Sequence, residues 1–235
     1  MSDVSWLEAV LARLAPAPGV PDLSLTVLGV VVLAATVLVF VDPLWRVLRV
    51  GITLVHELGH AFVGILCGRR FTGFVVRGDM SGHAVTVGPA RGAGRIATTW
   101  AGYPMPGLLA LGLVAATTHG YAAPLLALLL ALLALALPRV RSLTTGVVVL
   151  GAGVALGALW CSRDDVVQAQ VLVGIALVLL VGGWRHLAAV VSGTTPGSDA
   201  GVLRQLSGIP ASVWNATFAL TLAASTWGVW RLLAS

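Results

Sequence analysis

Long apolar runs set the first limit on what this chain can fold into. A helix needs about 20 mostly apolar residues to cross the hydrocarbon core of a membrane. The chain has 235 residues, of which 58% are hydrophobic and only 10% are charged, whereas a soluble domain has about 25% charged residues. We therefore expect an all-α polytopic membrane protein with about six or seven transmembrane helices. The predicted segments are 23–41, 44–66, 96–117, 121–137, 143–160, 166–190 and 211–232.

Two stretches depart from this apolar pattern. Residues 71–90, FTGFVVRGDMSGHAVTVGPA, carry β-branched residues on both sides of a group of turn formers, which predicts a β-hairpin between the second and third helices. The open edges of a hairpin cannot face lipid, so it must lie at the membrane surface or in a protein-lined cavity. Residues 1–22 predict an amphipathic segment on the membrane surface, and residues 23–235 a single transmembrane domain.

The charged residues indicate orientation rather than a binding surface. The net charge of +5 comes from arginine alone, a bias typical of a high-GC bacterial genome. The arginines are scattered between apolar runs, so we exclude nucleic acid as a partner and use them to orient the helices. A cytoplasmic N-terminus in the inner (plasma) membrane is predicted, because it puts most arginines inside. That inside set is Arg13, Arg69, Arg70, Arg77, Arg91, Arg95, Arg139, Arg141, Arg185 and Arg204.

The motif His-Glu-Leu-Gly-His at 56–60 lies within one of the apolar segments. Positions i and i+4 share a face of a helix, so His56 and His60 can bind one metal ion while Glu57 lies beside a water molecule. Zinc lowers the pKa of such a water, and the glutamate acts as the general base. Ionisable residues inside a membrane segment are expensive and indicate function. We therefore predict one Zn²⁺ per chain, with His56 and His60 as ligands.

Four stretches resemble those of a known family, the site-2 proteases. They are HELGHAFVGILCG, the hairpin FTGFVVRGDMSGHAVTV, AGYPMPGLLALGL at 101–113, and GSDAGVLRQLSGIPASVW at 197–214. The last is similar to the compact bacterial, peptidase-like branch. The resemblance implies an intramembrane zinc metalloprotease that hydrolyses peptide bonds of transmembrane or membrane-associated substrates in regulated intramembrane proteolysis. Its partners would be the membrane and a transmembrane protein or peptide.

The third zinc ligand in this family is an aspartate, usually in an Asp-Gly sequence, which this chain lacks. Asp199, in Ser-Asp-Ala-Gly, matches the branch pattern and is predicted on the same side of the membrane as the hairpin. It is our choice for the ligand, with a helix N-cap as the alternative role. Asp164 and Asp165 are the remaining candidates, although both fit the start of the helix at 166–190 better.

Other polar residues have weaker claims to a role. His83 falls in the hairpin, where it could bind substrate or remain solvated. His119 and His186 are expected to be interfacial anchors near helix ends. Asn215 could donate a hydrogen bond to a substrate carbonyl or could bridge two helices.

Two further functions compete with the protease. A catalytically silent relative would act as a membrane scaffold or binding protein, although it would have no use for Glu57. A metal transporter would need a second acidic cluster within the membrane, and the sequence has none. Nothing in the sequence specifies an oligomeric state.

Overall fold

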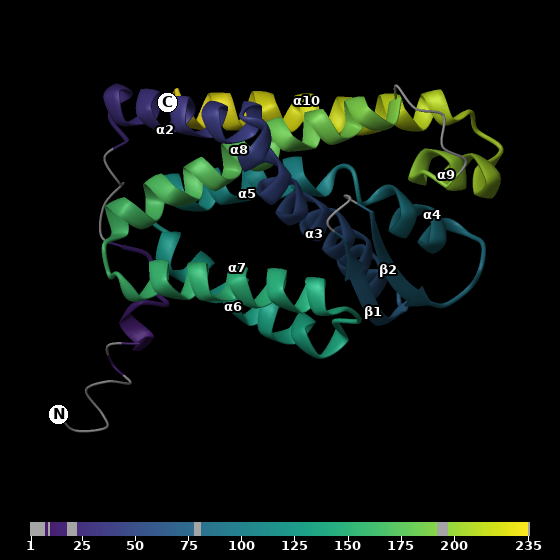
Figure 1. Cartoon of the computed structure of the whole chain (residues 1–235), viewed down its shortest axis with the longest axis horizontal. Helices are drawn as coiled ribbons and strands as arrows, with labels where there is room; N and C mark the ends of the chain where they lie inside the picture. Colours follow the sequence, from purple (N-terminus) through teal and green to yellow (C-terminus); the bar gives the residue numbers. More distant parts are fainter. Residues whose placement is uncertain (1–7, 9, 18–22, 78–80, 192–196, 235) are drawn as a thin grey trace.

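The chain forms a bundle of helices that carries one two-stranded hairpin at one end (Figure 1). The computed structural model describes all residues except 1–7, 9, 18–22, 78–80, 192–196 and 235. The elements are α2 (Leu25–Phe40), α3 (Asp42–Leu66), β1 (Arg70–Val76), β2 (Gly82–Val87), α4 (Ala93–Trp100), α5 (Met105–Thr118), α6 (Ala122–Ala136), the 3-10 turn η1 (Leu137–Arg139), α7 (Leu143–Cys161), α8 (Asp165–Val191), α9 (Asp199–Ser207) and α10 (Ala211–Leu233).

Helices α2 and α3 meet at an angle of 95°. Val41 between them is extended, and Pro43 lies in the first turn of α3, where its missing N–H cannot continue the hydrogen-bond ladder of α2. Arg185 of α8 donates to the carbonyl oxygen of Val39, and its guanidinium lies 4.3 Å from the centre of the Trp45 ring. The arginine therefore satisfies a carbonyl that the end of α2 leaves without a helical partner.

Helix α8 runs through the middle of the bundle and packs against α2, α5 and α10. Its residues Leu172, Val173 and Ala176 are completely buried. Lipid gives no hydrophobic drive for helices to associate, so close packing through small residues matters more. At Gly107 of α5, for example, an added Cβ would come within 2.8 Å of the Leu222 side chain of α10.

The outer surface of the bundle is apolar, as expected for a protein that contacts lipid. Leu25 and Leu143 are 88% and 86% exposed, and Val154 is 72% exposed. Soluble monomers rarely expose contiguous apolar surface of this kind.

The expected number of transmembrane helices was too high. Among the described residues, three helices are long and apolar enough to cross a membrane, and the bent pair α2–α3 would make a fourth. The bend falls between two predicted spans, which can therefore count as one broken span or a re-entrant pair. Helix α5 has 14 residues and is about 21 Å long, which is short of the roughly 30 Å hydrocarbon core. Helix α10 has sufficient length, but serine, threonine and tryptophan lower its hydropathy.

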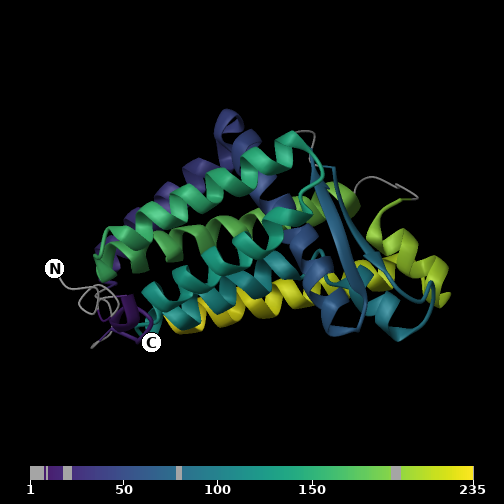
Figure 2. The same ribbon diagram turned by 90° about the horizontal axis from the view of Figure 1, so that it is seen from below.

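The predicted hairpin is confirmed, with β1 and β2 antiparallel and lying against α3 (Figure 2). Hydrogen bonds connect it to α7 and to the segment between η1 and α7, and the two shortest are 2.8 Å long. The N–H of Val76 donates to the hydroxyl of Thr145 in α7 at 2.8 Å. The Arg141 guanidinium donates to the carbonyl oxygen of Thr72, also at 2.8 Å. The hairpin is therefore held on a fixed support. Its tip, residues 78–80, lies outside the described residues.

The described residues around Arg13 lie at the opposite end of the bundle from the hairpin (Figures 1 and 2). Arg13 makes an ion pair of 3.4 Å with Asp165, at the start of α8. The sequence-based topology had placed Arg13 on the same side of the membrane as the hairpin, whereas in the structure the two lie at opposite ends of the bundle. Residues 1–7, 9 and 18–22 of the predicted surface segment lie outside the described residues.

The contact of α3 with the start of α5 can be tested at Gly59. An added Cβ would come within 2.7 Å of Met105 Cβ and 3.0 Å of the Ala101 carbonyl oxygen, and a backbone atom cannot rotate away. We expect Gly59→Ala to lower the free energy of unfolding by about 1–3 kcal/mol, measured by thermal unfolding in detergent. Gly29→Ala in α2, which meets nothing within 4 Å, is the control. Equal stability of the two variants would contradict the packing.

Candidate metal centre

Three side chains from two distant parts of the chain converge at the hairpin end of the bundle. His56 and His60 lie one turn apart on α3, and their Nε2 atoms are 3.1 Å apart. Asp199, the first residue of α9, places its Oδ2 atom 3.3 Å from the Nε2 atom of each histidine. The structure thus brings together the three residues that the sequence suggested as ligands.

The spacing of these three atoms fits a metal ion. In a tetrahedral zinc site with bonds of about 2.0–2.2 Å, neighbouring ligand atoms are about 3.3–3.6 Å apart. The observed triangle has edges of 3.1, 3.3 and 3.3 Å. An ion above such a triangle would keep a fourth position open toward the cavity described below.

The surroundings of the triangle favour nitrogen lone pairs that point inward. The carbonyl oxygen of Thr98 in α4 lies 2.7 Å from Nδ1 of His60. Since a carbonyl can only accept, Nδ1 of His60 carries a proton, which leaves Nε2 as the atom available to a metal, as in many metal sites. Oδ2 of Asp199 is buried without a hydrogen-bond partner among the described residues. A buried carboxylate in this place needs positive charge beside it, either protons on the imidazoles or a metal ion between the three side chains.

Helix α9 leaves the Asp199 carboxylate free for this role. Ser198 is the N-cap, and its hydroxyl accepts from the N–H of Gly201 at 3.3 Å. Asp199 is therefore not the cap, which was the alternative role considered from the sequence. Burial alone would raise the pKa of Asp199, but attraction to His60 and contacts with both imidazoles outweigh it and hold the pKa below its usual value. An ionised carboxylate is the form that binds a metal.

Glu57 lies beside the triangle rather than in it. It is 4% exposed, and it belongs to the same helix as the two histidines. Its carboxylate lies against Gly82 of β2, where an added Cβ would collide with Oε1. The general base predicted from the sequence is therefore held between α3 and the hairpin.

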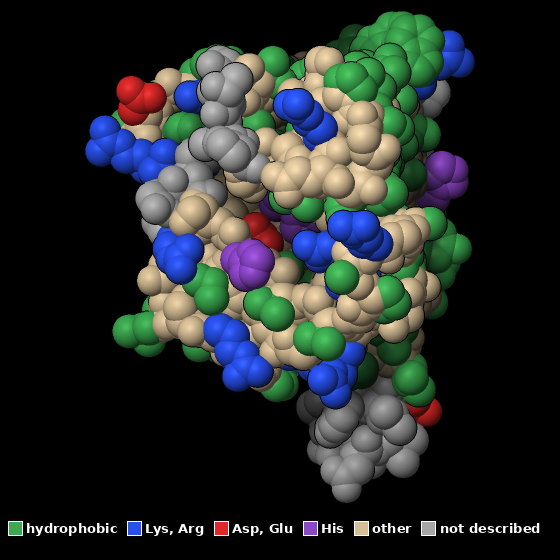
Figure 3. Space-filling view, turned by 90° about the vertical axis from the view of Figure 1, so that its right-hand side faces the viewer, with side chains coloured by type: hydrophobic (Ala, Val, Ile, Leu, Met, Phe, Trp, Pro, Cys, Tyr) green, Lys and Arg blue, Asp and Glu red, His purple; other side chains and the backbone are tan. Residues whose placement is uncertain are grey.

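All four residues line one cavity of about 280 Å³. Figure 3 shows the hollow, with acidic and histidine side chains in it and arginines around it. Gly102 lies directly against the two histidines, because an added Cβ there would be 2.5 Å from His60 Nε2 and 2.6 Å from His56 Cε1. Only glycine leaves room for both imidazoles at this position.

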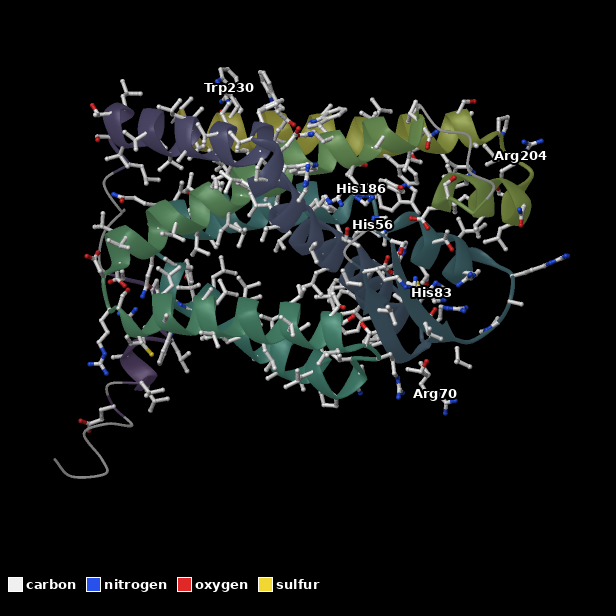
Figure 4. The ribbon with its side chains drawn as sticks, viewed as in Figure 1. His56, Arg70, His83, His186, Arg204 and Trp230 are labelled. Atoms are coloured by element: carbon white, nitrogen blue, oxygen red, sulfur yellow. The ribbon has the colours of Figure 1, made fainter. Side chains whose placement is uncertain are left out.

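His186 and Tyr103 also reach the cavity, and the sequence did not identify them. His186 was expected to be an interfacial anchor, but it lies five residues before the end of α8, and its ring centre is 5.3 Å from that of His56 (Figure 4). Tyr103 lies at 4.8 Å from His56 in a T-shaped contact. The signal that could have found His186 is an ionisable residue within an apolar helix.

The other candidate residues from the sequence lie outside the triangle of proposed ligands. His83 lines the cavity from β2 and is exposed. His119 ends α5 and contacts the carbonyl oxygen of Ala115 through Nδ1 at 2.7 Å. Asp164 accepts from the first N–H groups of α8, as expected for a cap. The Oδ1 atom of Asn215 is buried without a partner among the described residues, and this residue does not line the cavity.

Comparison with known proteins gives one match. The model of the Peptidase M50B-like family matches residues 29–229, a range that includes α3, the hairpin and Asp199. No curated protein and no solved structure matches the chain. Because the match extends over most of the 235 residues, the chain belongs to the Peptidase M50B-like family, within the site-2 proteases.

Proposed function

We propose that this protein is an intramembrane zinc metalloprotease that hydrolyses peptide bonds of transmembrane or membrane-associated substrates. The observation that carries the proposal is the convergence of His56, His60 and Asp199 beside Glu57 in one cavity. A catalytic zinc site has three protein ligands and one open position. A silent scaffold would have no need for the buried carboxylate of Glu57 in that place.

In the proposed hydrolysis, three residues bind the metal and a fourth transfers the proton. His56, His60 and Asp199 would hold the zinc, which supplies a Lewis acid that lowers the pKa of water and polarises a carbonyl. The Glu57 carboxylate takes a proton from the attacking water and gives it to the leaving amine. Gly82 lets the hairpin approach this carboxylate closely, which fixes the base beside the cavity.

The hairpin provides a place for the substrate chain. The amides of a transmembrane helix are bonded within the helix, so a segment must unwind before it can be cut. The described sheet has two strands, and β2 pairs only with β1 in it. Gly82, Ala84 and Thr86 of β2 line the cavity. An unwound segment can therefore pair with the free edge of β2 and lie across the site.

Charge distribution supports an orientation in the plasma membrane. Figure 3 shows many arginine side chains on the face around the cavity. The hairpin and the segments next to it (α4, α9 and the turn η1) carry Arg69, Arg70, Arg77, Arg91, Arg95, Arg139, Arg141 and Arg204. Because arginine-rich loops remain in the cytoplasm, this end and the catalytic cavity face the cytoplasm. The segment around Arg13 is then at the other side, which replaces the cytoplasmic N-terminus expected from the sequence.

Metal content tests the ligand set. Wild-type protein purified in detergent should contain about one zinc per chain, and His56→Ala, His60→Ala and Asp199→Ala should each lose most of it, because each removes one of three protein ligands. His119→Ala and Asp165→Ala are matched controls outside the cavity. Full zinc occupancy in the Asp199→Ala variant would reject Asp199 as the third ligand.

Glu57→Gln separates metal binding from hydrolysis. The amide keeps the shape of the side chain but cannot accept the proton, so cleavage of a reporter transmembrane peptide should fall by about 100-fold or more. Zinc content, measured on the same sample, should not change. Undiminished cleavage would reject Glu57 as the base, and loss of zinc would instead indicate that the glutamate supports the site.

The glycine beside the histidines offers an independent test. Gly102→Ala would place a methyl group against both imidazoles, so we expect loss of most of the zinc. Gly112→Ala in α5, which meets nothing within 4 Å, should keep the wild-type content. Zinc content and thermal unfolding should be measured together, because a variant that is folded and still fully loaded would contradict the geometry.

A further inference from the structure

His186 faces the candidate metal centre from the side opposite the hairpin. It projects from α8 into the cavity that Asp199 also lines. In Figure 4, His56 lies between His186 and His83 of the hairpin. Glu57 is held against the hairpin at Gly82. The general base and His186 are therefore on opposite sides of His56.

The position of the His186 ring is fixed by its neighbours. Its ring centre lies 5.3 Å from that of Tyr103, and Tyr103 in turn stacks on Phe218 of α10 at 5.0 Å. On either side in sequence, Arg185 is bound to the end of α2, and Leu187 is 4% exposed in the core beside Tyr103. A side chain on a rigid helix with both flanks packed holds its direction well.

His186 carries a ring N–H that can donate a hydrogen bond. Its ring is half-buried in the wall of the cavity, and the contacts found for it among the described residues are with the rings of His56 and Tyr103. It is also outside the cluster of His56, His60 and Asp199, whose ligand atoms lie within 4.8 Å of one another, so it lines the cavity beside the candidate ligands without being one of them. A polar side chain within an apolar helix is costly unless a partner binds it.

Hydrolysis of a peptide bond calls for a hydrogen-bond donor beside the carbonyl oxygen. When water adds to the carbonyl carbon of a peptide, its proton goes to Glu57 and the electrons of the C=O double bond move to the oxygen. That oxygen becomes an anion, and the C–N bond then breaks as the proton passes to the nitrogen. A fixed N–H directed at the developing anion is among the largest contributions to such catalysis.

We propose that His186 is a catalytic residue that donates a hydrogen bond to the carbonyl oxygen of the scissile peptide as this oxygen becomes negative, with Tyr103 holding the imidazole in place. This inference rests on the proposed protease function and adds a residue to it. Glu57 then accepts the proton of the water on the hairpin side, and His186 donates a hydrogen bond to the carbonyl oxygen on the α8 side.

Two substitutions of His186 test this role. His186→Leu removes the N–H, whereas His186→Gln keeps an N–H donor of similar reach. With a fluorogenic single-span peptide in detergent micelles, we expect the leucine variant to lower kcat by about 100- to 1,000-fold, with KM and zinc content little changed. The glutamine variant should recover about tenfold of this loss. His119→Leu, which lies outside the cavity, is the control and should keep wild-type kinetics.

Binding gives a second measurement that does not depend on turnover. In a Glu57→Gln background, His186→Leu should weaken a phosphinic peptide, whose charged oxygen resembles the tetrahedral intermediate, by about the same factor as kcat. It should leave the affinity for the uncleaved peptide unchanged.

The outcomes separate this inference from the function on which it rests. If the wild type cleaves the peptide and His186→Leu cleaves it equally well, His186 has no catalytic role. Loss of zinc in His186→Leu would indicate that His186 only holds His56 in position. Equal weakening of the phosphinic peptide and the uncleaved peptide would indicate the same. If the zinc-loaded wild type neither cleaves the peptide nor binds the phosphinic peptide, the protease function itself fails.

Discussion

One interaction inside the apolar bundle sets where the other elements must lie, and it is the attraction between the Asp199 carboxylate and the imidazoles of His56 and His60. Taking a carboxylate or an imidazolium out of water costs several kcal/mol per ion, and an apolar helix offers no other polar group to offset this. Asp199 meets His56 and His60 at 3.3 Å. Because this attraction falls steeply with distance, α3 and α9 must be held close. The glycines at 59, 82 and 102 remove side-chain volume where α3, the hairpin and the start of α5 approach one another.

Much of the site could be predicted from local pattern. The spacing of His56, Glu57 and His60 on a helix fixes a shared face, and the alternation in 71–90 fixes a hairpin. The prediction that Asp199 would lie near the histidines used the similarity of 197–214 to a known branch, and its geometry agrees. Its role as a ligand remains a prediction.

What the sequence did not reveal depends on contacts between distant segments. The bend between α2 and α3 is stabilised by Arg185, from a helix more than a hundred residues away, so hydropathy alone gave no sign of it and counted two separate spans. Without the bend, Arg13 was also expected at the same end as the hairpin. His186 was interpreted as an anchor because its apolar neighbours gave no indication that α8 passes beside the site.

The position of Asp199 on α9 also has a consequence for biosynthesis. The chain is made from the N-terminus, so both histidines and Glu57 leave the ribosome long before the aspartate. Helices α4 to α8 precede α9 in the chain, and α9 packs against α4 and α10. A nascent chain that has not reached α9 therefore has only two of the three proposed ligands. Under the proposed function, such a chain could not yet act on neighbouring membrane segments.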